Sequence, residues 1–97
     1  MGIHVLGTGS YTPAFQVTNE DMAKIVETND EWIRTRTGIE ERRIASPEQA
    51  TSDLAYEACL KALDMAGIKG EEVDAIIVGT ITPDYVFPST GCILQNR

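Results

Sequence analysis

The stretch of sequence that decides the fold is residues 51–79, TSDLAYEACLKALDMAGIKGEEVDAIIVG. Its first part predicts a helix that begins at Thr51 and ends at Gly67, because small and apolar residues recur at i, i+3 and i+4. Its last part, Ala75–Gly79, is an uninterrupted apolar run, which is typical of a strand covered on both faces in a parallel sheet. A helix followed by such a strand indicates an α/β fold. The predicted apolar stripe of the helix consists of Leu54, Ala55, Ala58, Cys59, Ala62, Leu63 and Ala66.

Shorter elements precede this unit. Residues 3–7 form a β-rich run that predicts a first strand, and the glycine-containing segment 7–10 predicts a tight loop after it. The loop is not a dinucleotide-binding fingerprint, because Thr12 stands where the third glycine would be and Pro13 follows without a helical period.

Two short helices are expected next. Thr18 or Asn19 can cap the first, and the second should run from Asp30 to Thr37 with Gly38 as its stop. The pattern 28–31 has the spacing of a capping box, in which the threonine hydroxyl and the glutamate carboxylate satisfy exposed backbone amides. Residues 39–45 are expected to be extended.

A last helix is predicted from Pro88 and Ser89 through Leu94, and no glycine, proline or basic last turn closes it before Arg97. We therefore expect residues 1–97 to be the N-terminal part of a larger domain that is truncated here. A single half-sheet leaves strand edges and helix faces uncovered, so the chain should expose apolar surface.

The composition bounds the class of protein. With 97 residues, 42% hydrophobic and 24% charged, the chain is expected to be soluble and globular, with no stretch long enough to span a membrane. The net charge of -7 argues against non-specific nucleic-acid binding. Cys59 and Cys92 make no disulfide framework, so a reducing cytosol is expected, and with His4 as the one histidine we expect no structural metal.

Half of the positive charges lie close together, and these are Arg34, Arg36, Arg42 and Arg43. They could receive an anionic ligand. The alternative is a solvated rim beside the acidic residues Glu40 and Glu41.

Three motifs, in this order and spacing, resemble one family: GTGSYTP at 7–13, DEWIRTRTGIEER at 30–42 and FPSTGC at 87–92. They are similar to the start of 3-oxoacyl-[acyl-carrier-protein] synthase III, also called beta-ketoacyl-ACP synthase III, of the thiolase superfamily. The resemblance covers essentially all 97 residues. It implies an α/β chain that forms the N-terminal, incomplete first half of a thiolase-like fold.

The resemblance also implies an activity. Members of this family start type II fatty-acid synthesis in the cytoplasm as homodimers. They join acyl-CoA, typically acetyl-CoA, to malonyl-acyl carrier protein by decarboxylative condensation. No cofactor is implied, because acyl-CoA is a substrate. The catalytic Cys, His and Asn of the family would lie beyond Arg97, so the 97 residues alone are predicted to be inactive, and Cys92 matches a buried structural cysteine of the family.

By resemblance, Thr28, Trp32 and Arg36 bind the adenine and phosphate end of coenzyme A. The residues themselves allow this, because an indole and a guanidinium four positions apart share one helix face. The alternative is that Trp32 is half-buried and Arg36 lies across it. Phe87 matches an aromatic residue that reaches into the partner's acyl pocket, and the alternative is a hydrophobic plug before Pro88.

Two further functions stay open. One is a related acyltransferase or polyketide starter synthase with a different acyl donor. The other is a non-catalytic module that binds coenzyme A or a carrier protein.

Overall fold

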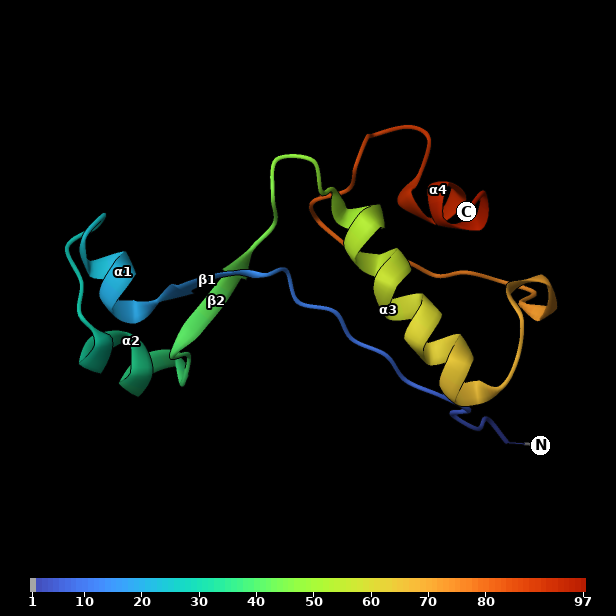
Figure 1. Ribbon diagram of the computed structural model, residues 1–97, viewed down its shortest axis with the longest axis horizontal. Coiled ribbons are helices and arrows are strands. Elements are labelled where there is room, and N and C mark those ends of the chain that lie inside the picture. Colours follow the sequence, from blue (N-terminus) through green and yellow to red (C-terminus); the bar gives the residue numbers. More distant parts are fainter. Residues whose placement is uncertain (1) are drawn as a thin grey trace. The chain divides into compact units, whose positions relative to one another are not determined.

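The computed structural model describes residues 2–97, which divide into two compact units (Figure 1). The smaller unit is Pro13–Ser46. The larger unit combines residues 2–12 with Pro47–Arg97.

The smaller unit is built from two strands and two helices: β1 (Phe15–Thr18), α1 (Asn19–Ala23), α2 (Asp30–Thr37) and β2 (Glu41–Ile44). The strands pair antiparallel, with Phe15 opposite Ile44 and Thr18 opposite Glu41. The extended segment predicted over 39–45 is therefore confirmed in its central part. Its partner β1 was not predicted, although Phe15 and Val17 alternate with polar residues as a short strand requires.

Local capping sets the helix ends of the smaller unit. The Thr18 hydroxyl accepts a hydrogen bond from the Asp21 amide, and the Asp21 carboxylate accepts one from the Thr18 amide, so the first of the two predicted caps is confirmed. Helix α1 ends earlier than its apolar pattern suggested, at Ala23. Helix α2 has the predicted bounds, and its stop Gly38 has a left-handed φ of 74°.

The predicted capping box at residues 28–31 is wrong. The cap of α2 is Asn29, whose Oδ1 accepts a hydrogen bond from the Trp32 amide at 2.8 Å. The residue directly before the first helical position is the one whose side chain reaches the amide at the third position, and here that residue is Asn29.

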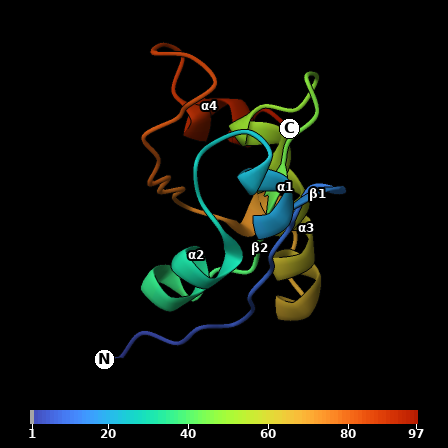
Figure 2. The same ribbon diagram turned by 90° about the vertical axis from the view of Figure 1, so that its left-hand side faces the viewer.

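The larger unit contains α3 (Thr51–Ala66), the short 3-10 helix η1 (Gly70–Glu72) and α4 (Thr90–Gln95). The predicted start and stop of α3 are confirmed, and Gly67 closes it with a φ of 70°. Ser89 caps α4 by accepting a hydrogen bond from the Cys92 amide. Figure 1 and Figure 2 both show α4 beside the N-terminal part of α3, against which it packs.

The two strands predicted at 3–7 and 75–79 have no strand partner among residues 2–97. The expectation that 75–79 is covered on both faces is therefore wrong for the described chain. Ile76 and Val78 lie near α4, since a Cβ on Gly91 would be 4.0 Å and 3.6 Å from their side chains, whereas Ile77 is 96% exposed. A β ladder needs neighbouring strands, and the described residues supply none for these two segments.

Two glycines allow the N-terminal segment to lie directly on α3. A Cβ on Gly7 would be 2.5 Å from the Ala62 carbonyl oxygen, and a Cβ on Gly9 would be 2.2 Å from the Ala58 carbonyl oxygen. Real Cβ atoms do not approach backbone this closely, so only glycine fits at these two positions.

Apart from Pro13, no apolar side chain of the described residues is buried. Cys59 and Cys92 are exposed, which corrects the prediction that both pack in a core, because no element among residues 2–97 covers these two side chains. The expected exposure of apolar surface is confirmed, most clearly for Ile3, Val5, Leu6, Ile77, Ile81, Val86 and Phe87. Within residues 2–97, no helix combines the length and the hydropathy that a bilayer crossing requires.

Candidate functional site

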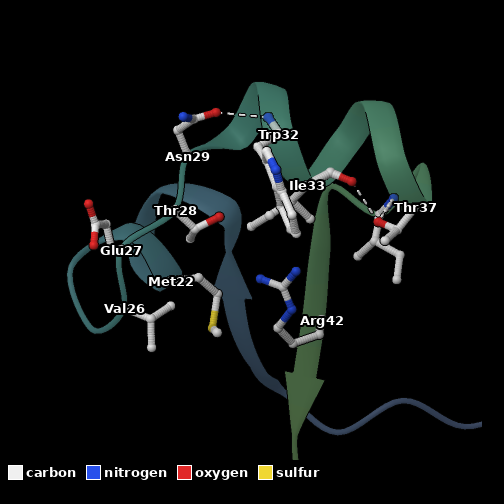
Figure 3. A pocket seen from close by; sticks show the side chains of 10 residues that line it. Met22, Val26, Glu27, Thr28, Asn29, Trp32, Ile33, Thr37 and Arg42 are labelled. Atoms are coloured by element: carbon white, nitrogen blue, oxygen red, sulfur yellow. Dashed lines mark hydrogen bonds between the residues drawn. The ribbon is translucent and has the colours of Figure 1, made fainter.

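The smaller unit contains a pocket of about 620 Å³. Helix α2, the turn that precedes it and strand β2 form its walls (Figure 3). The lining residues are Met22, Val26, Glu27, Thr28, Asn29, Trp32, Ile33, Thr37, Ile39 and Arg42. Two of the three predicted coenzyme A residues, Thr28 and Trp32, are thus brought together in one hollow.

Thr28 presents an unused hydroxyl to this pocket. Its Oγ1 is buried and, among the described residues, has no hydrogen-bond partner. Figure 3 shows the hydroxyl pointing inward, toward the space between Trp32 and Met22. A buried hydroxyl without a partner is costly, so this atom is suited to bonding a polar group of a ligand.

Trp32 stands in the first turn of α2 and projects its indole into the pocket (Figure 3). Its amide is fixed by the Asn29 cap, while its side chain is 52% exposed. The backbone of the residue is therefore held in place and the ring remains accessible.

Arg36 does not line the pocket, but its guanidinium carbon lies 5.0 Å from the centroid of the Trp32 ring. The two side chains share a helix face, as their spacing predicted, and form a cation–π contact. This is also the arrangement expected if Arg36 simply lies across a half-buried indole. The guanidinium covers one face of the ring, and a planar ligand could stack only on the opposite face.

The other three clustered arginines make hydrogen bonds within the smaller unit. Arg34 Nε lies 3.3 Å from Asp30 Oδ2, and Arg43 donates to the Pro13 carbonyl at 3.0 Å. Arg42 donates to Asn19 Oδ1 at 2.8 Å and to the Val17 carbonyl at 3.4 Å. The basic cluster is therefore neither a bare anion site nor a purely solvated rim, because two of its four members, Arg42 and Arg43, bind backbone carbonyls and Arg34 binds a carboxylate.

Asn19 lies behind the pocket wall and was not identified as a site residue from the sequence. It is 1% exposed, and its Nδ2 donates to Asp30 Oδ1 and to the Ile39 carbonyl, each at 2.8 Å. Its Oδ1 accepts a hydrogen bond from Arg42, and its backbone amide donates one to the Glu40 carbonyl at 3.1 Å. Its one local signal in the sequence is its place at a helix start, because its side-chain partners are 11 to 23 positions away.

Two carboxylates of the smaller unit are held in their charged form. The hydrogen bond from Asn19, with Arg34 assisting, holds the pKa of Asp30 below its usual value despite some desolvation. Hydrogen bonds from the Thr18 amide and hydroxyl lower the pKa of Asp21. Both carboxylates therefore stay ionised at neutral pH.

Phe87 belongs to the larger unit, where its side chain is 89% exposed. The loop that carries it is tied to α3 by Asp84, whose carboxylate accepts hydrogen bonds from the Ser52 amide at 2.7 Å and the Ser52 hydroxyl at 2.5 Å. The exposure rules out the alternative of a plug covered by residues 2–97. Among these residues, no cluster of three or more His, Cys, Asp or Glu side chains could hold a metal ion.

No family model matches the chain. The Beta-ketoacyl-[acyl-carrier-protein] synthase III of Xanthomonas campestris pv. campestris is 60% identical over 93 residues, which are 96% of this chain and 29% of that protein. The chain thus spans about three tenths of the length of the curated relatives it matches.

Solved structures give the same result. The 3-oxoacyl-[acyl-carrier-protein] synthase III of Aquifex aeolicus VF5 is similar with a TM-score of 0.91 and 49% identity, over 98% of this chain and 30% of that one. The priming beta-ketosynthase of the R1128 polyketide pathway is similar with a TM-score of 0.89 and 35% identity, over 96% of this chain and 28% of that one. The fold is therefore a part of the thiolase-like α/β fold of these condensing enzymes, and in sequence and structure the chain corresponds to a segment of the beta-ketoacyl-[acyl-carrier-protein] synthase III family.

Proposed function

We propose that this chain is the N-terminal part of an initiating condensing enzyme of type II fatty-acid synthesis. The complete enzyme would join acyl-CoA, typically acetyl-CoA, to malonyl-ACP by decarboxylative condensation. The contribution of the described residues would be to bind the nucleotide end of coenzyme A. The observation that carries this proposal is the Trp32–Arg36 pair at the edge of a pocket that also holds the unused Thr28 hydroxyl.

The chemistry of the three side chains suits an adenine nucleotide. An indole offers a flat apolar face on which a heterocycle can stack. A guanidinium supplies donors and a permanent charge for phosphate oxygens, and a hydroxyl can bond one further polar atom. The pocket volume of about 620 Å³ lies within the range of small-molecule sites, about 300–1,000 Å³.

The reaction itself would be performed by residues outside this chain. In the proposed enzyme a Cys thiolate takes the acyl group as a thioester, and His and Asn stabilise the carbanion equivalent formed by decarboxylation. We therefore expect the 97 residues alone to yield no product from acyl-CoA and malonyl-ACP. Product formation by this chain would contradict the proposal.

The binding role is tested in the complete enzyme by calorimetry with coenzyme A. Trp32→Ala and Arg36→Ala are each expected to raise the Kd by about 10-fold, the usual size of a lost stacking or charged contact. Arg34→Ala is the matched control, because it also removes an arginine from α2. This arginine is paired with Asp30 and not with the Trp32 ring. An unchanged Kd in the double variant of Trp32 and Arg36 would refute the role.

The second candidate is a polyketide priming synthase, which the similarity to the R1128 priming beta-ketosynthase favours. It differs in its acyl donor. Profiling the complete enzyme with acyl-CoA donors of increasing length separates the two, because a fatty-acid initiator is expected to favour acetyl-CoA. A third candidate, a non-catalytic binding module, would require the 97 residues alone to bind coenzyme A in a way that Trp32→Ala abolishes.

The remaining parts of the proposal concern partners. We infer a cytoplasmic homodimer in which Phe87 reaches into the partner's acyl pocket and limits chain length. The support for this is the exposed position of Phe87 on a loop that Asp84 anchors. Replacing Phe87 with Ala in the complete enzyme should then shift the preference toward longer acyl-CoA, and an unchanged preference would contradict it.

A further inference from the structure

We propose that Asn19 is a positioning residue for the pocket, a buried amide that holds the beginning of α2 and strand β2 on either side of the space proposed for the nucleotide. The inference rests on the proposed function and adds to it a residue that touches no ligand. Asn19 is the most buried large side chain of the described residues, at 1% exposed, in a unit whose one buried apolar residue among those described is Pro13.

The hydrogen bonds of Asn19 reach three parts of the pocket wall. Asp30 is the first residue of α2 and follows the cap Asn29, which lines the pocket. Ile39 lines the pocket with its side chain while its carbonyl accepts from Asn19. Arg42 lines the pocket from β2, and Figure 3 shows its guanidinium below the Trp32 ring. One side chain therefore connects the helix that carries Trp32 to the strand opposite it.

Only an amide fits this position. The Asn19 side chain donates two hydrogen bonds and accepts one at the same time, which neither a carboxylate nor an apolar group can do. It also stands between the negative Asp30 and the positive Arg42 as a neutral bridge. Without it, the three partly buried bonds would be lost, and Arg42 would keep only its longer bond to the Val17 carbonyl, which allows it to reorient toward Trp32.

The exchange of two side chains gives a sharp test. Asn19→Asp keeps the acceptor for Arg42 but removes both donors and places a second carboxylate beside Asp30. Adding Asp30→Asn restores a bond between positions 19 and 30 with donor and acceptor reversed. Asp30→Asn alone, which also removes the Arg34 ion pair, controls for that loss.

The experiment measures steady-state kinetics of the complete enzyme with two donors, acetyl-CoA and an acetyl-pantetheine that lacks the nucleotide. For Asn19→Asp and Asn19→Ala we expect the KM for acetyl-CoA to rise about 10-fold, with little change in kcat and in the KM for acetyl-pantetheine. The double exchange should return the acetyl-CoA KM to within about 3-fold of the starting value.

A general structural defect would affect both donors equally, and that result would overturn the proposal. A double exchange whose acetyl-CoA KM is no lower than that of Asn19→Asp would also overturn the proposal. This comparison does not use Asn19→Ala, so it can be made even if that variant fails to fold. The Trp32→Ala enzyme is measured in the same assay. If it raises the acetyl-CoA KM and the Asn19 variants do not, the positioning role fails alone; if it does not, the nucleotide site itself fails.

Discussion

Different kinds of contact stabilise the two units of this chain, each within itself. The smaller unit, Pro13–Ser46, depends on a buried polar side chain, Asn19, whose bonds all end within the unit. The larger unit depends on backbone approach at Gly7 and Gly9 and on the Asp84 carboxylate at the start of α3. Around these contacts it leaves apolar side chains such as Ile77 and Ile81 almost fully exposed.

The two units differ in how far the groups that they hold find partners among the described residues. Buried polar groups are satisfied within the smaller unit, apart from the Thr28 hydroxyl, which faces the pocket. In the larger unit the apolar residues that would form a sheet have no neighbouring strand among residues 2–97. The pocket is thus carried by the unit whose hydrogen bonds to the buried Asn19 end within it, although apolar side chains such as Phe15, Ile25 and Ile44 are exposed there as well.

The largest expected effect lies in the contact between the N-terminal segment and α3. Gly9→Val places a Cβ 2.2 Å from the Ala58 carbonyl oxygen and should cost about 3 kcal/mol or more, so that residues 2–12 leave the helix. Hydrogen exchange along residues 2–12 measures this. Gly79→Val is the control, since a Cβ there meets nothing within 4 Å. Equal effects of the two changes would break the distinction between packed and open segments.

The next effect concerns the anchor of the loop that carries Phe87. Asp84→Ala removes the acceptor of two hydrogen bonds from Ser52, which is 3% exposed, and should lower the free energy of unfolding by about 2–3 kcal/mol. Urea denaturation of the complete protein measures the change. Asp74→Ala, at an exposed position of the same unit, should change it by less than about 0.5 kcal/mol. A small effect of Asp84→Ala would mean that this loop is held elsewhere.

A smaller effect is expected at the beginning of α1. Thr18→Ala removes one half of the capping box with Asp21 and should lower stability by about 1 kcal/mol. Thr12→Ala, at an exposed position before β1, is the control. Urea denaturation measures both, and equal effects would show that the smaller unit does not depend on this cap.

The smallest effect is the response to acid. The folded pKa values of Asp21 and Asp30 lie below the unfolded value of 3.8, so their stabilisation is present above that pH and is lost as the pH falls through the folded values. Carboxyl NMR titration should show both pKa values below 3.8, and Asn19→Ala should raise that of Asp30. An unshifted Asp30 in the unsubstituted protein would contradict the hydrogen bond that defines the smaller unit.

Local signals in the sequence predicted much of the fold. The bounds of α2 and α3 follow from residues next to the helix ends, and the stops Gly38 and Gly67 adopt the left-handed conformation that glycine favours. The α/β class and the similarity to the synthase III family also follow from the sequence, through three motifs spread along the chain. The strands predicted at 3–7 and 75–79 were not confirmed among residues 2–97, because a strand needs a paired neighbour and pairing is not a property of a single segment.

The site was predicted only in part, for a related reason. Trp32 and Arg36 are four positions apart, so helix geometry alone brings them together. Asn19 meets Asp30, Ile39 and Arg42 only after the chain has turned twice, and no local pattern contains that information. The cap at Asn29 instead of Thr28 shows how a shift of one residue frees a hydroxyl for the pocket.

The two glycine contacts on α3 also define a register. Gly7 meets Ala62 and Ala66, and Gly9 meets Ala58 and Ala62, so two extended residues, about 6.6 Å, run antiparallel to one helical turn of about 5.4 Å. The two glycines therefore allow one register of the segment on α3, because sliding it by one residue would bring Thr8, with its Cβ, onto the helix backbone. A residue inserted between the two glycines should therefore break one of their contacts with α3. A residue inserted before Gly7 should leave both contacts unchanged.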